Sequence, residues 1–305
     1  MNLAGVFAPV PTPFDERDHV DPARLRAAFL TWLATPLTGF VVLGSNGEAA
    51  LMDDAESDRL VDEARQIVPR DRPLIVGTGR ESTQAAANAA RRAADLGADA
   101  VLVRTPGFFK AQMTSEALVR HYQTVADQSP VPLLLYNFTA VTGVNLQPAA
   151  VTQLAHHSNI IGMKESGGDV AQIAELVAGT PSDFRVLAGS STTFFAALCV
   201  GASGGILALA AVLPHACARL FHLTREGRYD EARALQRRLT PVSRLVGSVY
   251  GVAGLKAALK MVGCDVGRPR PPLLPAPDAA TAALKAELEG LLEELPSGLS
   301  PTMSA

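Results

Sequence analysis

Residues 160–168 read IIGMKESGG, an apolar run that ends in a lysine, a glutamate and a serine. A run of this kind is typical of a parallel strand that helices cover on both faces. Only five of the 27 basic residues are lysines, and Lys164 stands where this strand leaves the core. An amine in an apolar site is more readily found uncharged, and an uncharged amine can attack a carbonyl to form a Schiff base. Taken alone, however, such a lysine is more often one that extends from the strand end into solvent.

Seven other apolar runs alternate with helix-like segments along the chain. With 160–163, the predicted strands cover residues 5–10, 39–43, 74–77, 100–103, 133–136, 185–188 and 205–209. The segments between them carry helix signals, such as the Asp53 and Glu56 capping box and the terminal Gly97. Eight parallel strands are the number that closes a barrel. The sequence therefore predicts an α/β fold, a (β/α)8 TIM barrel.

After the eighth predicted strand the alternation stops. Residues 229–245, 254–262 and 278–294 have helical patterns with no strand between them. They predict a C-terminal helical appendage to the barrel. We expect a catalytic barrel domain over residues 1–225, a helical domain over 226–295 and a mobile tail over 296–305.

Composition argues against several classes of protein. A net charge of −3 over 305 residues gives no electrostatic case for binding nucleic acid or an anionic membrane. The sequence shows neither a long uncharged apolar stretch nor the pattern of a signal peptide. The three cysteines suit reduced thiols in a cytoplasmic protein. Since no metal-ligand spacing and no phosphate-binding glycine loop is present, we expect neither a metal nor a cofactor.

The active site of such a barrel lies where the strands end at their carboxyl termini. This rule places Lys164 near Tyr136, which ends the fifth predicted strand. The loop GSNGE at 44–48 follows the second strand and could present Ser45, Asn46 and its backbone amides to a carboxylate. A phenol beside an imine-forming lysine could move protons during the reaction.

Each of these features also has a plainer explanation. GSNGE could be an ordinary strand-to-helix turn, in which Gly, Ser and Asn are common. A buried tyrosine is often a core residue whose hydroxyl is bonded to the backbone. Their shared end of the barrel favours a functional site. The seventh and eighth strands would add further substrate contacts there, namely Gly189, Ser190, Ser191 and Ile206.

Together these residues resemble the dihydrodipicolinate synthase / N-acetylneuraminate lyase family of class I aldolases. The resemblance covers residues 5–274 and rests on PTPF at 11–14, GSNGE at 44–48, TP at 105–106, YN at 136–137, TG at 142–143, GMKES at 162–166, and Gly189 with Gly205 and Ile206. It implies a barrel that assembles as a homotetramer, a dimer of dimers. It also implies that Lys164 forms a Schiff base with a 2-oxo acid, that Tyr136 relays protons, and that Ser45 and Asn46 bind the substrate carboxylate and complete the relay.

Two positions depart from the family's synthases, which condense pyruvate with aspartate semialdehyde. Those enzymes resemble this chain around Tyr136 but carry an arginine where Val141 stands here. They also use a tyrosine from a neighbouring subunit, and Phe108 occupies that position. A phenyl ring cannot pass a proton, so these two positions argue against a role in lysine biosynthesis.

Other segments look like 4-hydroxy-2-oxoglutarate aldolase, among them GFVV at 39–42, ESTQ at 81–84, KESGGD at 164–169, LAGS at 187–190 and GLK at 254–256. We therefore expect a carbon–carbon lyase that cleaves 4-hydroxy-2-oxoglutarate to pyruvate and glyoxylate, with Lys164 and Tyr136 as catalytic residues. A dihydrodipicolinate synthase and an aldolase or dehydratase of 2-keto-3-deoxy sugar acids are the alternatives. A barrel that binds a 2-oxo acid without turning it over is the alternative from a different class.

Overall fold

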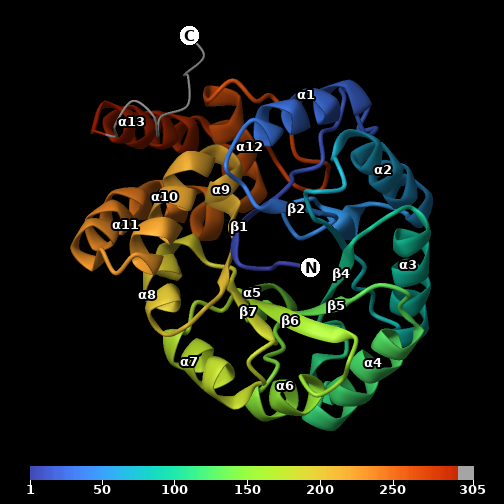
Figure 1. The fold of residues 1–305 in the computed structure, drawn as a ribbon. Coiled ribbons are helices and arrows are strands. Elements are labelled where there is room, and N and C mark those ends of the chain that lie inside the picture. Colours follow the sequence, from blue (N-terminus) through green and yellow to red (C-terminus); the bar gives the residue numbers. More distant parts are fainter. Residues whose placement is uncertain (295–305) are drawn as a thin grey trace.

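Eight parallel strands form a closed barrel in their order along the chain, and β1 pairs with β8 to complete the ring. This computed structural model of the chain describes residues 1–294. Figure 1 shows the ring of helices that surrounds the strands. The strands are β1 (Gly5–Pro9), β2 (Gly39–Val42), β3 (Leu74–Gly77), β4 (Ala100–Arg104), β5 (Leu133–Asn137), β6 (Ile160–Glu165), β7 (Arg185–Ala188) and β8 (Gly204–Ile206). The predicted (β/α)8 barrel is confirmed.

Longer helices follow the strands and cover the barrel. They are α1 (Pro22–Leu33), α2 (Asp54–Ile67), α3 (Thr83–Asp95), α4 (Ser115–Gln128), α6 (Pro148–Leu154), α7 (Val170–Gly179), α8 (Phe194–Cys199) and α10 (Pro214–Arg225). Short helical turns lie in the loops: η1 (Ala49–Leu51), η2 (Lys110–Gln112), α5 (Thr139–Thr142), η3 (Ser191–Thr193) and α9 (Ala208–Val212). The predicted capping box is present, because Asp53 accepts from the Glu56 amide and Glu56 accepts from the Asp53 amide.

The barrel separates two apolar layers. Successive side chains of a strand point to opposite faces of the sheet. In β5, Leu134 and Tyr136 therefore pack in the inner cluster, whereas Leu133 and Leu135 pack against the helices. The inner cluster is completed by Leu3, Phe7, Val41, Ile75, Ala100, Leu102, Leu187 and Ile206. Side chains at the carboxyl ends of the strands thus lie on top of a filled, apolar barrel.

The eighth strand differs from the prediction for residues 205–209. β8 ends at Ile206, and Ala208 begins α9. The sequence there is rich in alanine and leucine, both good helix formers, so a short apolar run was assigned the wrong element. The segment that follows β7 begins with the separate 3-10 turn η3 before α8.

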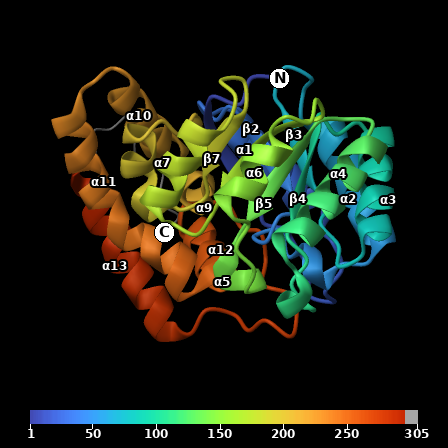
Figure 2. The ribbon, with the colours of Figure 1, turned by 90° about the horizontal axis from the view of Figure 1, so that it is seen from below.

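In the described part of the chain, three helices follow α10. They are α11 (Tyr229–Arg244), α12 (Gly251–Met261) and α13 (Asp278–Glu294), and α11 continues into the π-helical turn η4 (Leu245–Val249). Figure 1 shows α11 and α13 beside α10, at one side of the ring of helices. In Figure 2, α12 and the connector to α13 lie toward the same end of the barrel as α5, opposite the N-terminus. The tail expected at 296–305 lies outside the described residues. Within residues 1–294, no helix is long and apolar enough to cross a membrane.

Candidate active site

Lys164 and Tyr136 lie opposite each other on neighbouring strands inside the barrel. The pairing of β5 with β6 places the two residues in register. Lys164 is 5% exposed and Tyr136 is 4% exposed. The Lys164 Nζ donates to the Tyr136 hydroxyl at 3.4 Å and lies 4.5 Å from the centre of its ring. A buried amine held against a phenol can exchange protons with it during a reaction.

Ser45 extends this pair into a chain of three polar groups. Its Oγ lies 3.3 Å from the Tyr136 hydroxyl, within hydrogen-bonding distance. Asn46 is the next residue, and both side chains are half-buried. The structure therefore brings together the predicted lysine and tyrosine, from β6 and β5, and the predicted serine, from the loop that follows β2.

The loop that carries Ser45 has an uncommon backbone. Leu43, just before the loop, and Glu48, its last residue, both have φ of 55°. This is a left-handed conformation that residues with a side chain seldom adopt. The loop passes directly over β3, where a Cβ on Gly77 would overlap the Leu43 carbonyl. At its far end, the Thr12 hydroxyl donates to the Gly47 carbonyl at 2.6 Å. In the sequence Thr12 stood out only as part of the PTPF motif and not as a site residue, because its partner is a backbone atom 35 residues away.

Gly189 lies against Lys164 from the other side. A Cβ at this position would lie 3.0 Å from the Lys164 Cε and would overlap the Ser166 hydroxyl. Only glycine therefore leaves space beside the lysine. The Ser166 Oγ is buried and has no hydrogen-bond partner among the residues described. It was not predicted as a site residue, although a position two residues beyond Lys164 points to the same face of the strand.

The other predicted substrate contacts are less closely tied to Lys164. The Ser190 hydroxyl lies 2.9 Å from that of Thr192, and the Ser191 carbonyl accepts from Gln236 of α11 at 3.0 Å. Ile206 is fully buried in the inner cluster with Tyr136. It forms part of the apolar filling beneath the polar groups.

A polar network lies behind Lys164, on the outer face of β5 and β6. The Glu165 carboxylate accepts from Asn137 at 2.7 Å and from Gln172 at 3.1 Å. Asn145 in turn accepts from Asn137 at 2.7 Å. Burial raises the pKa of Glu165, and the hydrogen bond from Asn137 opposes this effect. The network joins β5, β6 and α7 next to the reactive pair.

The two positions that depart from the synthase pattern lie on the surface of the described chain. Val141 on α5 is 60% exposed, and Phe108 is 79% exposed beside Phe109. The two rings meet edge to face with 5.0 Å between their centres. Their loop is held by Glu81, whose carboxylate accepts from the backbone amides of Gly107 and Phe108, each at 2.9 Å.

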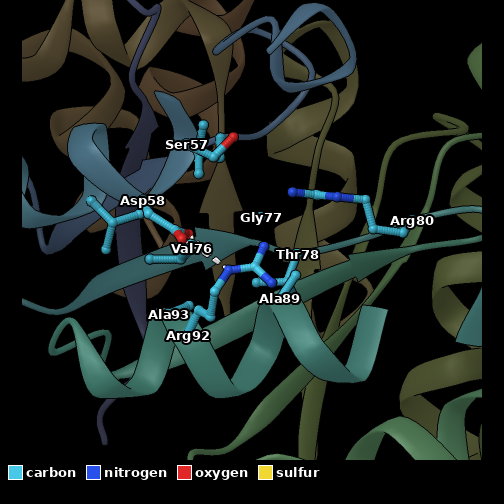
Figure 3. A pocket seen from close by; sticks show the side chains of 11 residues that line it. Ser57, Asp58, Val76, Gly77, Thr78, Arg80, Ala89, Arg92 and Ala93 are labelled. Atoms are coloured by element: carbon cyan, nitrogen blue, oxygen red, sulfur yellow. Dashed lines mark hydrogen bonds and ion pairs between the residues drawn. The ribbon is translucent and has the colours of Figure 1, made fainter. Parts of the chain in front are cut away.

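A separate small pocket lies between β3, α2 and α3, as Figure 3 shows. It has room for little more than a water molecule. Arg92 points toward Asp58 beside it and donates to that carboxylate at 2.9 Å. Its lining includes the Ser57 and Thr78 hydroxyls, which have no partner in the described part of the chain. None of the predicted site residues lines this pocket.

Comparison with known proteins gives a consistent assignment. The model of the dihydrodipicolinate synthetase family matches residues 2–291. The 4-hydroxy-tetrahydrodipicolinate synthase of Exiguobacterium sp. is 34% identical over 287 residues, which are 94% of this chain and 97% of the relative. The protein named "Probable 4-hydroxy-2-oxoglutarate aldolase, mitochondrial" of Emericella nidulans is 34% identical over 290 residues, 93% of each chain.

Solved structures agree with the sequence relatives. The dihydrodipicolinate synthase of Bacillus anthracis superimposes with a TM-score of 0.91 at 27% identity, covering 97% of this chain and 99% of that one. Members of the family are lyases or aldolases that form or break carbon–carbon bonds. The chain therefore belongs to the dihydrodipicolinate synthetase family and is a carbon–carbon lyase of that family.

Proposed function

We propose that the protein is a class I aldolase that cleaves 4-hydroxy-2-oxoglutarate to pyruvate and glyoxylate through a Schiff base on Lys164. The observation that carries the proposal is the buried contact of Lys164 with Tyr136 at 3.4 Å, continued to Ser45 at 3.3 Å. Imine formation and cleavage need a nucleophilic amine with a proton-carrying group beside it, and these residues supply both.

The reaction proceeds by imine formation and bond cleavage. The Lys164 amine attacks the C2 carbonyl, and loss of water leaves an imine. The protonated imine accepts the electron pair of the C3–C4 bond while Tyr136 takes the proton of the C4 hydroxyl. Glyoxylate leaves, and pyruvate remains on the lysine as an enamine. Tyr136 returns a proton to the enamine carbon, and hydrolysis then releases pyruvate and the free amine.

The remaining site residues bind the substrate in this proposal. Ser45, Asn46 and their backbone amides hold the C1 carboxylate, because an array of N–H and O–H donors suits an anion. Gly189 leaves space beside the imine, and Ser190 and Ser191 line the part of the site that receives the aldehyde half. Ile206 supplies an apolar surface beneath the substrate.

The choice of substrate rests on the two surface positions and one relative. Val141 gives no cation for the second substrate of a synthase, and Phe108 gives no hydroxyl for its proton relay. The name of the Emericella nidulans relative supports the aldolase. The name of the Exiguobacterium relative favours a second candidate, a 4-hydroxy-tetrahydrodipicolinate synthase.

A substrate panel distinguishes these candidates. We expect the highest kcat/KM for cleavage of 4-hydroxy-2-oxoglutarate, measured by release of pyruvate. Faster condensation of pyruvate with aspartate semialdehyde would identify a synthase instead. Preferred cleavage or dehydration of 2-keto-3-deoxy sugar acids would move the assignment to that class. Binding of 2-oxo acids without turnover of any would indicate a barrel that only binds them.

The covalent step is tested by reduction with borohydride in the presence of pyruvate. We expect one reduced adduct, found by mass mapping on the peptide that contains Lys164, because Lys164 is the lysine beside Tyr136. Lys164→Ala should abolish the adduct, whereas Lys285→Ala should retain it, since Lys285 is an exposed residue of α13. An adduct that persists in folded Lys164→Ala protein contradicts the proposal.

The cellular location belongs to the same proposal. Cys199, Cys217 and Cys264 are free thiols in the structure. Free thiols persist in a reducing compartment, so we propose a cytoplasmic enzyme.

A further inference from the structure

A buried lysine of the C-terminal helices reaches the loop that carries Ser45. Lys256 of α12 places its Nζ 2.7 Å from the Glu48 carboxylate, and the two side chains are 2% and 0% exposed. The same Nζ donates to the Thr12 carbonyl at 2.7 Å and to the Arg268 carbonyl at 2.9 Å. The ammonium group is therefore held by one ion pair and two hydrogen bonds to backbone carbonyls.

Glu48 is held on its other oxygen as well. That oxygen accepts from the Arg270 backbone amide at 2.7 Å. Arg270 extends the cluster outward, because its guanidinium pairs with Glu56 at 2.6 Å. The Phe14 ring lies beneath both cations, 4.6 Å from the Lys256 Nζ and 4.2 Å from the Arg270 guanidinium carbon.

The loop needs an external support of this kind. Glu48 has φ of 55°, and a left-handed residue with a side chain persists only where its surroundings enforce that conformation. Three positions earlier, Ser45 presents its hydroxyl to Tyr136. A shift of Glu48 would therefore move the Ser45 hydroxyl relative to the reactive pair.

Fold stability alone does not account for the ion pair. Replacing a buried pair with apolar side chains is often neutral or stabilising, because removing both charges from water costs as much as their attraction returns. Burial lowers the pKa of Lys256, and attraction to Glu48 opposes that effect. The pair joins α12 to the loop after β2, and this contact fixes the position of the loop relative to the barrel.

We propose that Glu48 and Lys256 are positioning residues that hold the loop at 44–48 so that Ser45 and Asn46 meet the substrate and Tyr136. This inference rests on the proposed function. It extends the active site to α12, a helix that follows the last barrel strand by more than forty residues of chain.

The test compares Lys256→Met in two backgrounds. The readout is the rate of borohydride-trapped adduct formation at low pyruvate, with thermal unfolding measured on each variant. In the natural sequence we expect a loss of about ten- to a hundredfold, because small displacements of a site are costly. In a Ser45→Ala/Asn46→Ala background, Lys256→Met should lower the trapping rate about threefold or less. The two sets of substitutions act on the same groups, so their effects are not additive.

Lys260→Met is the matched control, because Lys260 is an exposed lysine of the same helix. It should leave the trapping rate unchanged in both backgrounds. Equal losses for Lys256→Met in the two backgrounds would show a merely structural role and overturn the inference.

A second variant covers the case in which Lys256→Met does not fold. Glu48→Gln keeps the shape of the side chain and an acceptor for the Arg270 amide, and it removes the charge. The same two-background comparison applies to it, with the same expected difference. If the natural protein forms no adduct with pyruvate, the proposed function fails and takes this inference with it. If the adduct forms but the losses are equal, the inference fails alone.

Discussion

The Tyr136 hydroxyl can be removed without removing the ring that fills the site. The ring stacks on Phe138 with 6.0 Å between centres, and Tyr136→Phe keeps this contact. We expect kcat for cleavage to fall about 10²- to 10⁴-fold, the usual range for loss of a general acid–base group. Borohydride should still trap pyruvate on Lys164, at a lower rate. Tyr229→Phe is the control, since Tyr229 is half exposed on α11. Unchanged turnover by Tyr136→Phe would contradict the proton relay.

The contact among Lys164, Tyr136 and Ser45 could be predicted because barrel geometry places the ends of the strands together. Lys164, Tyr136 and Ser45 each follow an apolar run, and their contact depends on strand register, which the fold sets. Ser166 was missed although it lies two residues beyond Lys164, because the sequence does not show that its hydroxyl lacks a partner. Lys256 was noted only as part of a resemblance. Its contact with Glu48 spans most of the chain, and no local pattern encodes it.

At the scale of elements, α4 is attached to α3 through a buried histidine. The His121 Nδ1 lies 2.9 Å from the Thr83 hydroxyl, and burial lowers the pKa of His121 from 6.5 to about 4. The unfolded chain binds a proton near pH 6.5 and the folded chain does not, so the folded state is favoured above that pH. Its advantage is lost as the pH falls from about 6.5 to about 4.

Urea unfolding measures this effect. Between pH 7 and pH 5 we expect His121 to account for about 2 kcal/mol of lost stability. His121→Asn should remove that part of the pH dependence, and His156→Asn, at an exposed position after α6, should retain it. A pH dependence that His121→Asn leaves unchanged would show that the pKa of His121 is the same in the folded and unfolded chains, which contradicts the prediction.

Element prediction succeeded where local chemistry is distinctive and failed where it is not. The capping box of α2 has the predicted contacts, and β3 and β7 have the predicted bounds, because side-chain caps and short apolar runs between turns are local signals. The boundary between β8 and α9 was wrong because alanine and leucine are compatible with either element. The end of β8 is set by its pairing with β1, which closes the barrel and stops at Ile206.

At the scale of the whole molecule, two exposed aromatic rings indicate a surface for association. Phe108 and Phe109 are 79% and 65% exposed, and their loop is fixed by Glu81. We propose that they lie in a subunit interface of the expected homotetramer. Phe108→Ser/Phe109→Ser should shift the protein to smaller species in analytical ultracentrifugation. Leu274→Ser, at a residue that is 79% exposed elsewhere, should not. A tetramer that survives the double substitution would place the interface elsewhere.

The closed ring of strands also limits how this chain can aggregate. A sheet with a free edge offers unpaired amides and carbonyls to other chains, and a closed barrel offers none. The described strands are all paired, and β8, with three residues, is the shortest. Growth of β-rich fibrils would first require a strand to leave the ring. The seam of β7 with β8, which pairs over two residues, is the place where the fewest ladder bonds need to break. The rate of fibril nucleation should therefore depend on the rate at which that seam opens. A cross-link between the two strands should suppress fibrils without changing the side chains on the surface of the protein.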